Sequence, residues 1–135
     1  ALSLAVHAGT AFQLTNVLRD LGEDLTAGRV YLPAEDVARF RTPPESWQDP
    51  ARASDVRSML AFQADRARQF YRRAAPLADL LESDGRAVYI AMSGLYTRLL
   101  AEIERREFDV FSSRVRLGNL AKLRILLGAY LRKFA

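Results

Sequence analysis

The chain has 135 residues, of which 50% are hydrophobic and 27% are charged, and it contains no cysteine. This composition indicates a globular domain or a piece of one, and it excludes disulfide bonds and thiolate metal sites. The net charge is +4 and 18 of the 20 basic residues are Arg, which favours an anionic partner without choosing among phosphate, lipid headgroups and nucleic acid.

The first predicted element is a long helix from about Leu2 to Leu25, which ends before Gly28, a residue type common just past helix ends. Pro33 suits a first helical position and predicts a short helix through about Phe40. No strand alternation and no internal repeat is found here or further along the chain.

A loop is expected at residues 42–47, because two consecutive prolines cannot lie inside a helix. Asp49 and Pro50 are typical of a cap followed by a first-turn proline, and they predict a second long helix that runs to about Glu82. Pro76 is expected to kink this helix. Its apolar stripe is expected to consist of Val56, Leu60, Gln63, Ala67, Phe70, Ala74, Leu77 and Leu81.

Residues 83–85, Ser-Asp-Gly, are expected to break the helix, and a further helix is predicted over residues 86–106. Residues 108–116 have no regular pattern, and a last helix is predicted over residues 117–133. The apolar face of the third long helix is expected to contain Val88, Met92, Leu95, Leu99 and Ile103. The predicted fold class is therefore all-α, a helical bundle.

Polar side chains follow one edge of the first helix. Gln13, Asn16, Asp20 and Asp24 fall within an arc of roughly 80°, given about 100° per residue. A different arc carries the apolar side chains of Leu14, Val17, Leu18, Leu21 and Leu25. The helix therefore has an oxygen-rich face that is separate from its apolar face.

Within this row, Asp20 and Asp24 are one turn apart and have no basic partner. Two like charges at this spacing destabilise a helix, and a divalent cation relieves the repulsion. Mg²⁺ prefers carboxylate oxygens together with substrate phosphate oxygens. Arg19 is expected to pair with Glu23 or to reach a phosphate. The alternative interpretation is a solvated polar face, since a lone Asp-x-x-x-Asp pattern is common.

The same segment resembles a known family signature. Residues 12–24 with residues 28–33 resemble the second aspartate-rich motif of squalene/phytoene synthases, and residues 107–111, 114–116 and 122–123 resemble the C-terminal segment of that family. The resemblance is strongest to bacterial phytoene synthases. It implies the C-terminal portion of an isoprenoid synthase fold, and it implies the Mg²⁺-dependent head-to-head condensation of two prenyl diphosphates in carotenoid or isoprenoid biosynthesis.

The resemblance also implies roles for single residues. Asn16, Asp20 and Asp24 are implied as metal ligands for Mg²⁺, with Mn²⁺ as an alternative, and the two aspartates are implied as catalytic. Substrate binding is implied for Gln13, Arg19, Arg29, Tyr31 and Arg114. One departure from the family pattern is Phe108, which stands where relatives usually have Tyr, so no hydroxyl contact is expected there.

The family's first aspartate-rich motif is not found in the sequence. Residues 1–135 are therefore expected to be the C-terminal half of a single domain, to need the missing N-terminal half as a partner, and to be inactive alone. Geranylgeranyl diphosphate is the expected substrate. The alternatives are a squalene or dehydrosqualene synthase that uses farnesyl diphosphate, and a non-catalytic helical scaffold.

A nucleic-acid partner is not expected, because Asp20, Glu23 and Asp24 would repel phosphate in the absence of a metal. No apolar run reaches the roughly 20 residues of a membrane-spanning helix. A cytoplasmic location is expected, with peripheral contact to the inner face of the membrane as a further expectation. His7 is expected to be a packed side chain, Trp47 to anchor its loop on the bundle, and the basic group of Arg66, Arg68, Arg72 and Arg73 to form a solvated face.

Overall fold

The computed structural model describes residues 1–131, and these contain helices and no strands. The α-helices are α1 (Leu2–Thr26), α2 (Ala34–Arg39), α3 (Ala53–Ala74), α4 (Ser83–Arg105) and α5 (Asn119–Leu131). Three short 3-10 helices, η1 (Pro44–Ser46), η2 (Pro50–Arg52) and η3 (Ala75–Leu80), lie in the connections. The predicted all-α class is confirmed.

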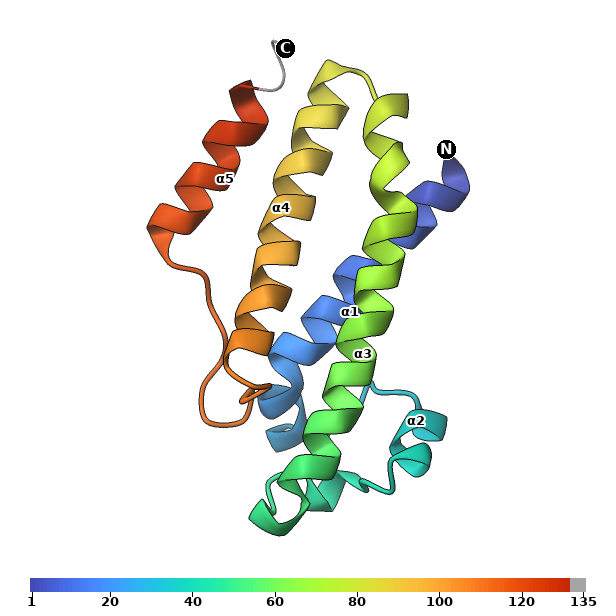
Figure 1. The fold of residues 1–135 in the computed structure, drawn as a ribbon, viewed down its shortest axis with the longest axis vertical. Coiled ribbons are helices and arrows are strands. Elements are labelled where there is room, and N and C mark those ends of the chain that lie inside the picture. The colour runs from blue at the N-terminus through green and yellow to red at the C-terminus, as the bar shows by residue number, and fades with distance from the viewer. Residues whose placement is uncertain (132–135) are drawn as a thin grey trace.

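The long helices form a bundle (Figure 1). Helices α3 and α4 run antiparallel, α1 crosses behind them, and α5 lies along the outer side of α4. The short helix α2 lies beside the lower end of α3, and the α4–α5 connector forms a wide loop at the same end of the bundle. The site described below is formed where this connector meets α1.

The core forms between α1, α3 and α4. Its buried residues are Val17, Leu18, Leu21, Leu32, Trp47, Val56, Met59, Leu60, Ala64, Ala67, Leu99, Leu100, Ile103, Val110 and Val115. Burial of this apolar area is the main favourable contribution to folding. Val17, Leu18 and Leu21 belong to the predicted apolar face of the first helix, which is confirmed. Trp47 anchors its loop on the bundle as expected, because its side chain is buried in this core, and its Nε1 donates to the carbonyl of Thr42 within the loop.

The predicted C-terminal end of the second long helix, at about Glu82, was wrong. The α-helix stops at Ala74, and the chain continues as η3 with Pro76 in its first turn, because proline has no N–H for the α-helical ladder. The predicted break at residues 83–85 was also wrong. The backbone is extended at Leu81 and Glu82, and α4 begins at Ser83, where polar residues and an acidic first turn favour a helix start.

The last helix begins at Asn119 rather than at residue 117, and the predicted end at residue 133 lies outside the described residues. The predicted apolar face of α4 is buried only toward its C-terminal end. Leu99 and Ile103 are buried, whereas Val88 is 60% exposed and Met92 is 40% exposed. Tyr89, in the same part of α4, packs instead against the cluster of Ala8, Ala74 and Leu77.

The predicted solvated arginine face is wrong for Arg66, whereas Arg68 is exposed as expected. Arg66 donates to the buried carboxylate of Asp36 at 2.8 Å, and Gln63 donates to the same oxygen at 2.7 Å. Arg68 pairs with Glu104 of α4 and with Asp65. The first cluster fixes α2 against α3, because a buried carboxylate requires partners that replace its water.

Candidate active site

The polar edge of α1 is partly open to solvent. Gln13 is exposed, whereas Asn16, Asp20 and Asp24 are half-buried. The apolar face of the same helix is packed against α3 and α4, so the polar edge keeps a fixed orientation. The predicted separation of the two faces is confirmed.

Gly22 lets the α4–α5 connector cross α1 beside Asp20. A Cβ atom at Gly22 would lie 2.6 Å from the carbonyl oxygen of Val110 and 3.3 Å from the Cα of Phe111. Such distances are below van der Waals contact, so only glycine permits this crossing. The crossing brings Arg114, which follows in the connector, to the polar edge of α1.

Asp20 is held by two arginines. Arg19 donates from Nε to Oδ1 at 2.7 Å and from Nη2 to Oδ2 at 2.6 Å. Arg114 contacts Oδ1 from Nε at 3.0 Å and from Nη2 at 2.9 Å, and its Nε lies 3.7 Å from Glu23. Arg19 therefore pairs with Asp20 instead of with Glu23, and its expected contact with a phosphate stays a prediction.

The charges around Asp20 are coupled. Partial burial alone raises the pKa of Asp20, but the hydrogen bonds and charges of Arg19 and Arg114 outweigh it, so this pKa lies below its usual value. The hydrogen bond to Asp20 in turn raises the pKa of Arg19. Asp20 is therefore ionised at neutral pH.

The turn after α1 brings Arg29 back to Asp24. Gly28 has a φ of +71°, and the amides of Gly28 and Arg29 donate to the carbonyls of Leu25 and Asp24. This is a Schellman ending, which needs a residue in the left-handed region. The Arg29 guanidinium then donates to Asp24 Oδ1 at 3.0 Å. Tyr31, two residues further on, is 58% exposed.

Asn16 has one satisfied and one unsatisfied polar atom. Its Nδ2 lies 3.4 Å from the hydroxyl of Tyr96 in α4, whereas its Oδ1 is buried without a hydrogen-bond partner. A buried acceptor without a partner is costly unless a ligand completes it. On the core side of α1, Thr15 shares a 2.8 Å hydrogen bond with Tyr71, and burial raises the pKa of Tyr71 to about 12.

A cavity of about 460 Å³ adjoins the Asp20 cluster. Its basic lining residues are Arg19, Arg114, Arg116 and Lys122. The remaining wall is formed by Leu95, Tyr96, Leu99, Val115, Leu117 and Leu126. The cavity therefore joins several cations to a leucine-rich wall between α1, α4, α5 and the connector.

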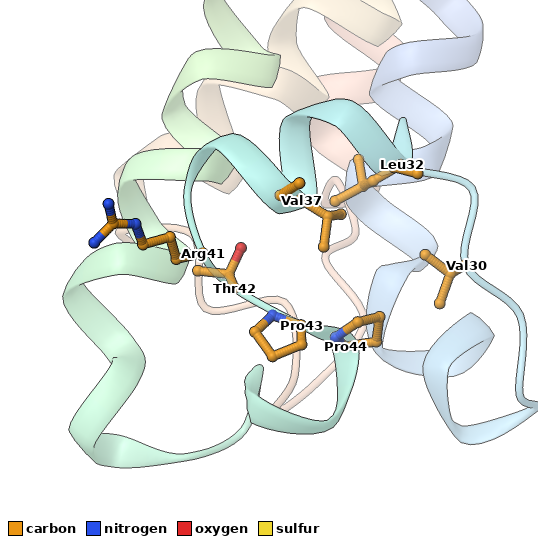
Figure 2. Close-up of a pocket in the computed structure, with 9 residues that line it drawn as sticks. Val30, Leu32, Val37, Arg41, Thr42, Pro43 and Pro44 are labelled. Atoms are coloured by element: carbon orange, nitrogen blue, oxygen red, sulfur yellow. The ribbon is translucent and has the colours of Figure 1, made fainter.

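A second cavity, of about 600 Å³, lies under α2 (Figure 2). Val30, Pro43 and Pro44 face this space, whereas the guanidinium of Arg41 points away from it. None of the predicted site residues lines this cavity. Its wall is almost wholly apolar and offers no set of groups for binding an anion.

Within residues 1–131, no three His, Cys, Asp or Glu side chains gather closely enough to hold a metal ion. Over the same residues no helix is both long enough and apolar enough to cross a bilayer. Asn16, Asp20 and Asp24 follow one edge of α1, and each carboxylate is paired with arginine.

Comparison with known proteins identifies the family. The sequence profile of squalene/phytoene synthases matches residues 1–121. The chain belongs to the squalene/phytoene synthase family. A phytoene synthase from Arthrospira platensis is 40% identical over 129 residues, which cover 95% of this chain and 41% of the relative. The 15-cis-phytoene synthase of Synechocystis sp. is 38% identical, over 95% of this chain and 38% of the relative.

The fold of this family member agrees with a solved structure. A crystal structure of a dehydrosqualene synthase in complex with ligand superposes with a TM-score of 0.82 at 26% identity, and the match covers 96% of this chain and 46% of that chain. The chain thus spans less than half the length of each of these relatives.

Some site features were not predicted from the sequence. Tyr96 was not named as a site residue, and Lys122 was named only as part of the family resemblance. Both line the basic cavity. The requirement for glycine at position 22 was also missed, although a glycine inside a long helix is itself a signal of a packing requirement.

Proposed function

We propose that this protein takes part in the head-to-head condensation of two prenyl diphosphates, with geranylgeranyl diphosphate converted to phytoene in carotenoid biosynthesis. One observation carries the proposal, namely that the Asp20 carboxylate and the leucine-lined cavity share Arg19 and Arg114. A prenyl diphosphate has the matching division into an anionic head and a hydrocarbon tail. The phytoene synthases among the relatives support the choice of substrate.

The metal that we propose is Mg²⁺, with Mn²⁺ as an alternative, held by Asn16, Asp20 and Asp24. The donor set supports this, because it consists of two carboxylates and the buried, unpartnered Oδ1 of Asn16. Hard oxygen donors of this kind suit Mg²⁺, which binds few protein carboxylates together with substrate phosphate oxygens. When bound, the metal would neutralise negative charge on the departing diphosphate.

The remaining site residues would act on the substrate itself. We assign diphosphate binding to Arg19 and Arg114, whose planar guanidinium groups match phosphate geometry. Arg29 and Tyr31 would order the diphosphate region from the α1–α2 connector. The leucines of the cavity wall would bind the prenyl chain and exclude water, which strengthens electrostatic stabilisation of the leaving group.

We also propose that the complementary carboxylates come from protein outside residues 1–135, and that these residues are the C-terminal half of one domain. The exposed positions of Gln13, Val88 and Met92 support a covering partner. In that arrangement Gln13 would face the substrate channel. Residues 1–135 alone are expected to give no product.

Two other functions are carried as alternatives. The dehydrosqualene synthase fold supports farnesyl diphosphate as the substrate, with squalene or dehydrosqualene as the product. A non-catalytic scaffold descended from the family is the other alternative. The unpartnered Oδ1 of Asn16 disfavours the scaffold, because a buried acceptor without a partner destabilises the helix without serving its packing.

The experiment is a product assay with Mg²⁺ and either geranylgeranyl or farnesyl diphosphate. The protein contains residues 1–135 joined to the complementary half of a phytoene synthase relative. Phytoene from geranylgeranyl diphosphate, lost in Asp20→Asn and Asp24→Asn, is the expected result. Product from farnesyl diphosphate alone would support the first alternative, and folded protein without any product would support the scaffold.

For location, we propose a cytoplasmic protein with peripheral membrane contact. Leu120, Leu123 and Leu127 of α5 are each more than half exposed, and Lys122 and Arg124 lie between them in the sequence. Apolar residues together with basic residues favour the interface of an anionic bilayer. Co-sedimentation with anionic but not neutral vesicles is expected, and equal recovery with both vesicle types would argue against the proposal.

A further inference from the structure

The contacts at Asp20 bear on how a metal would bind. Oδ1 accepts hydrogen bonds from both Arg19 and Arg114, and Oδ2 accepts one from a second nitrogen of Arg19. Oδ1 is therefore shared by two guanidinium groups, and the departure of Arg114 would leave it with one contact, from Arg19, and a lone pair for a metal. A divalent cation bound at about 2.1 Å from either oxygen would stand beside a guanidinium and be repelled by it.

From this geometry we infer that Arg114 is a resident counter-cation of Asp20 that moves to the diphosphate when metal and diphosphate bind together. The inference rests on the proposed function and adds an exchange of partners to it. In the absence of diphosphate, Arg114 would compete with the metal for Asp20. When diphosphate is bound, Arg114 would contact the diphosphate and leave Asp20 to the metal.

The two arginines differ in how freely they can leave. Arg19 belongs to α1 and is adjacent to Asp20 in sequence, so its backbone keeps it close to the carboxylate. Arg114 comes from the irregular connector between α4 and α5, and its side chain is 34% exposed. A side chain outside helical structure and open to solvent changes rotamer at lower cost, so Arg114 is the member that moves.

The cavity beside Asp20 provides the position to which Arg114 would move. Its side chain lines the cavity of about 460 Å³ that also contains Arg116 and Lys122. Without an anion, movement of Arg114 toward these cations is opposed by like-charge repulsion. A diphosphate in the cavity would reverse the sign of that interaction and provide bidentate acceptors for the guanidinium.

The exchange predicts cooperative binding. Diphosphate would draw Arg114 away from Asp20 and raise the affinity of the metal, and by linkage the metal would raise the affinity of diphosphate by the same factor. Arg116 provides a matched control, because it lies two residues from Arg114, lines the same cavity and carries the same charge.

The test is Mn²⁺ binding measured by electron paramagnetic resonance, with and without inorganic pyrophosphate. It uses the full protein as wild type, Arg114→Gln, Arg116→Gln and Asp20→Asn. Without pyrophosphate, Arg114→Gln is expected to bind Mn²⁺ about tenfold more tightly than Arg116→Gln, which is the size of one partly exposed charge-assisted hydrogen bond. The enhancement by pyrophosphate is expected to be smaller in Arg114→Gln than in wild type.

The other outcomes distinguish failure of the inference from failure of the proposed metal site. Equal gains in Arg114→Gln and Arg116→Gln would show a general charge effect and overturn the inference while the metal site stands. Unchanged Mn²⁺ binding in Asp20→Asn would overturn the proposed metal site, and the inference would fall with it. Arg114→Lys, which keeps the charge but not the fork, is expected to fall between wild type and Arg114→Gln, and circular dichroism checks that each variant is folded.

Discussion

Replacing Gly22 by Ala tests how the connector is held against α1. The added Cβ would lie 2.6 Å from the carbonyl oxygen of Val110 and 3.3 Å from the Cα of Phe111. Both are backbone atoms, so the connector must shift. Overpacking of this kind costs about 1–3 kcal/mol. Alanine in a helix interior recovers about 0.5–1 kcal/mol relative to glycine, so the net loss is expected between about 0 and about 2.5 kcal/mol, with a centre of about 1 kcal/mol.

Gly9 provides the matched control within the same helix. A Cβ at Gly9 meets nothing within 4 Å, so Gly9→Ala is expected to raise the free energy of unfolding by about 0.5–1 kcal/mol. Urea unfolding followed by circular dichroism measures both variants. Equal stabilisation in Gly9→Ala and Gly22→Ala would show that the connector does not press on position 22.

Two further predictions concern the buried and charged clusters. Asp36→Ala leaves Gln63 and Arg66 without their shared acceptor, so it is expected to lower the free energy of unfolding by about 3 kcal/mol. Urea unfolding measures this loss, and an unchanged urea midpoint would show that the Asp36 carboxylate does not hold α2. The pKa of Asp20 is lowered because its two arginine partners outweigh desolvation, so its contribution to stability is present above its unfolded pKa near 3.8 and lost as the pH falls below it. The stability difference between wild type and Asp20→Asn should therefore shrink between about pH 5 and about pH 3, and a constant difference would contradict the ion pair.

The fold class and the faces of α1 could be predicted from the sequence because both depend on helical periodicity. Leu18 and Leu21 recur at the spacing that buries one side of a helix, and they are buried. The helix ends were harder to predict. Pro76 was read as a kink, but the chain changes to a 3-10 helix there, and Ser83 begins α4 because polar residues serve helix starts as well as breaks.

The ion pairs of the site could not be predicted from local spacing. Arg114 is 94 residues from Asp20 in sequence, and it reaches the carboxylate only because the connector crosses α1 at Gly22. The α1 row therefore looked unpaired. Asp24 is paired by Arg29 through the reversal at Gly28, a turn whose position was predicted but whose effect on the side chains was not.

We propose that the polar edge of α1 and the basic cavity bind metal and prenyl diphosphate as one unit. The most direct measurement is the melting temperature of the protein with Mg²⁺, with a non-hydrolysable geranylgeranyl diphosphate analogue, and with both together. Stabilisation only with both is predicted, about 2.7 kcal/mol when the analogue is at 100 times its dissociation constant. An equal shift with DNA or RNA, or a full shift with the analogue in the absence of metal, would contradict the claim.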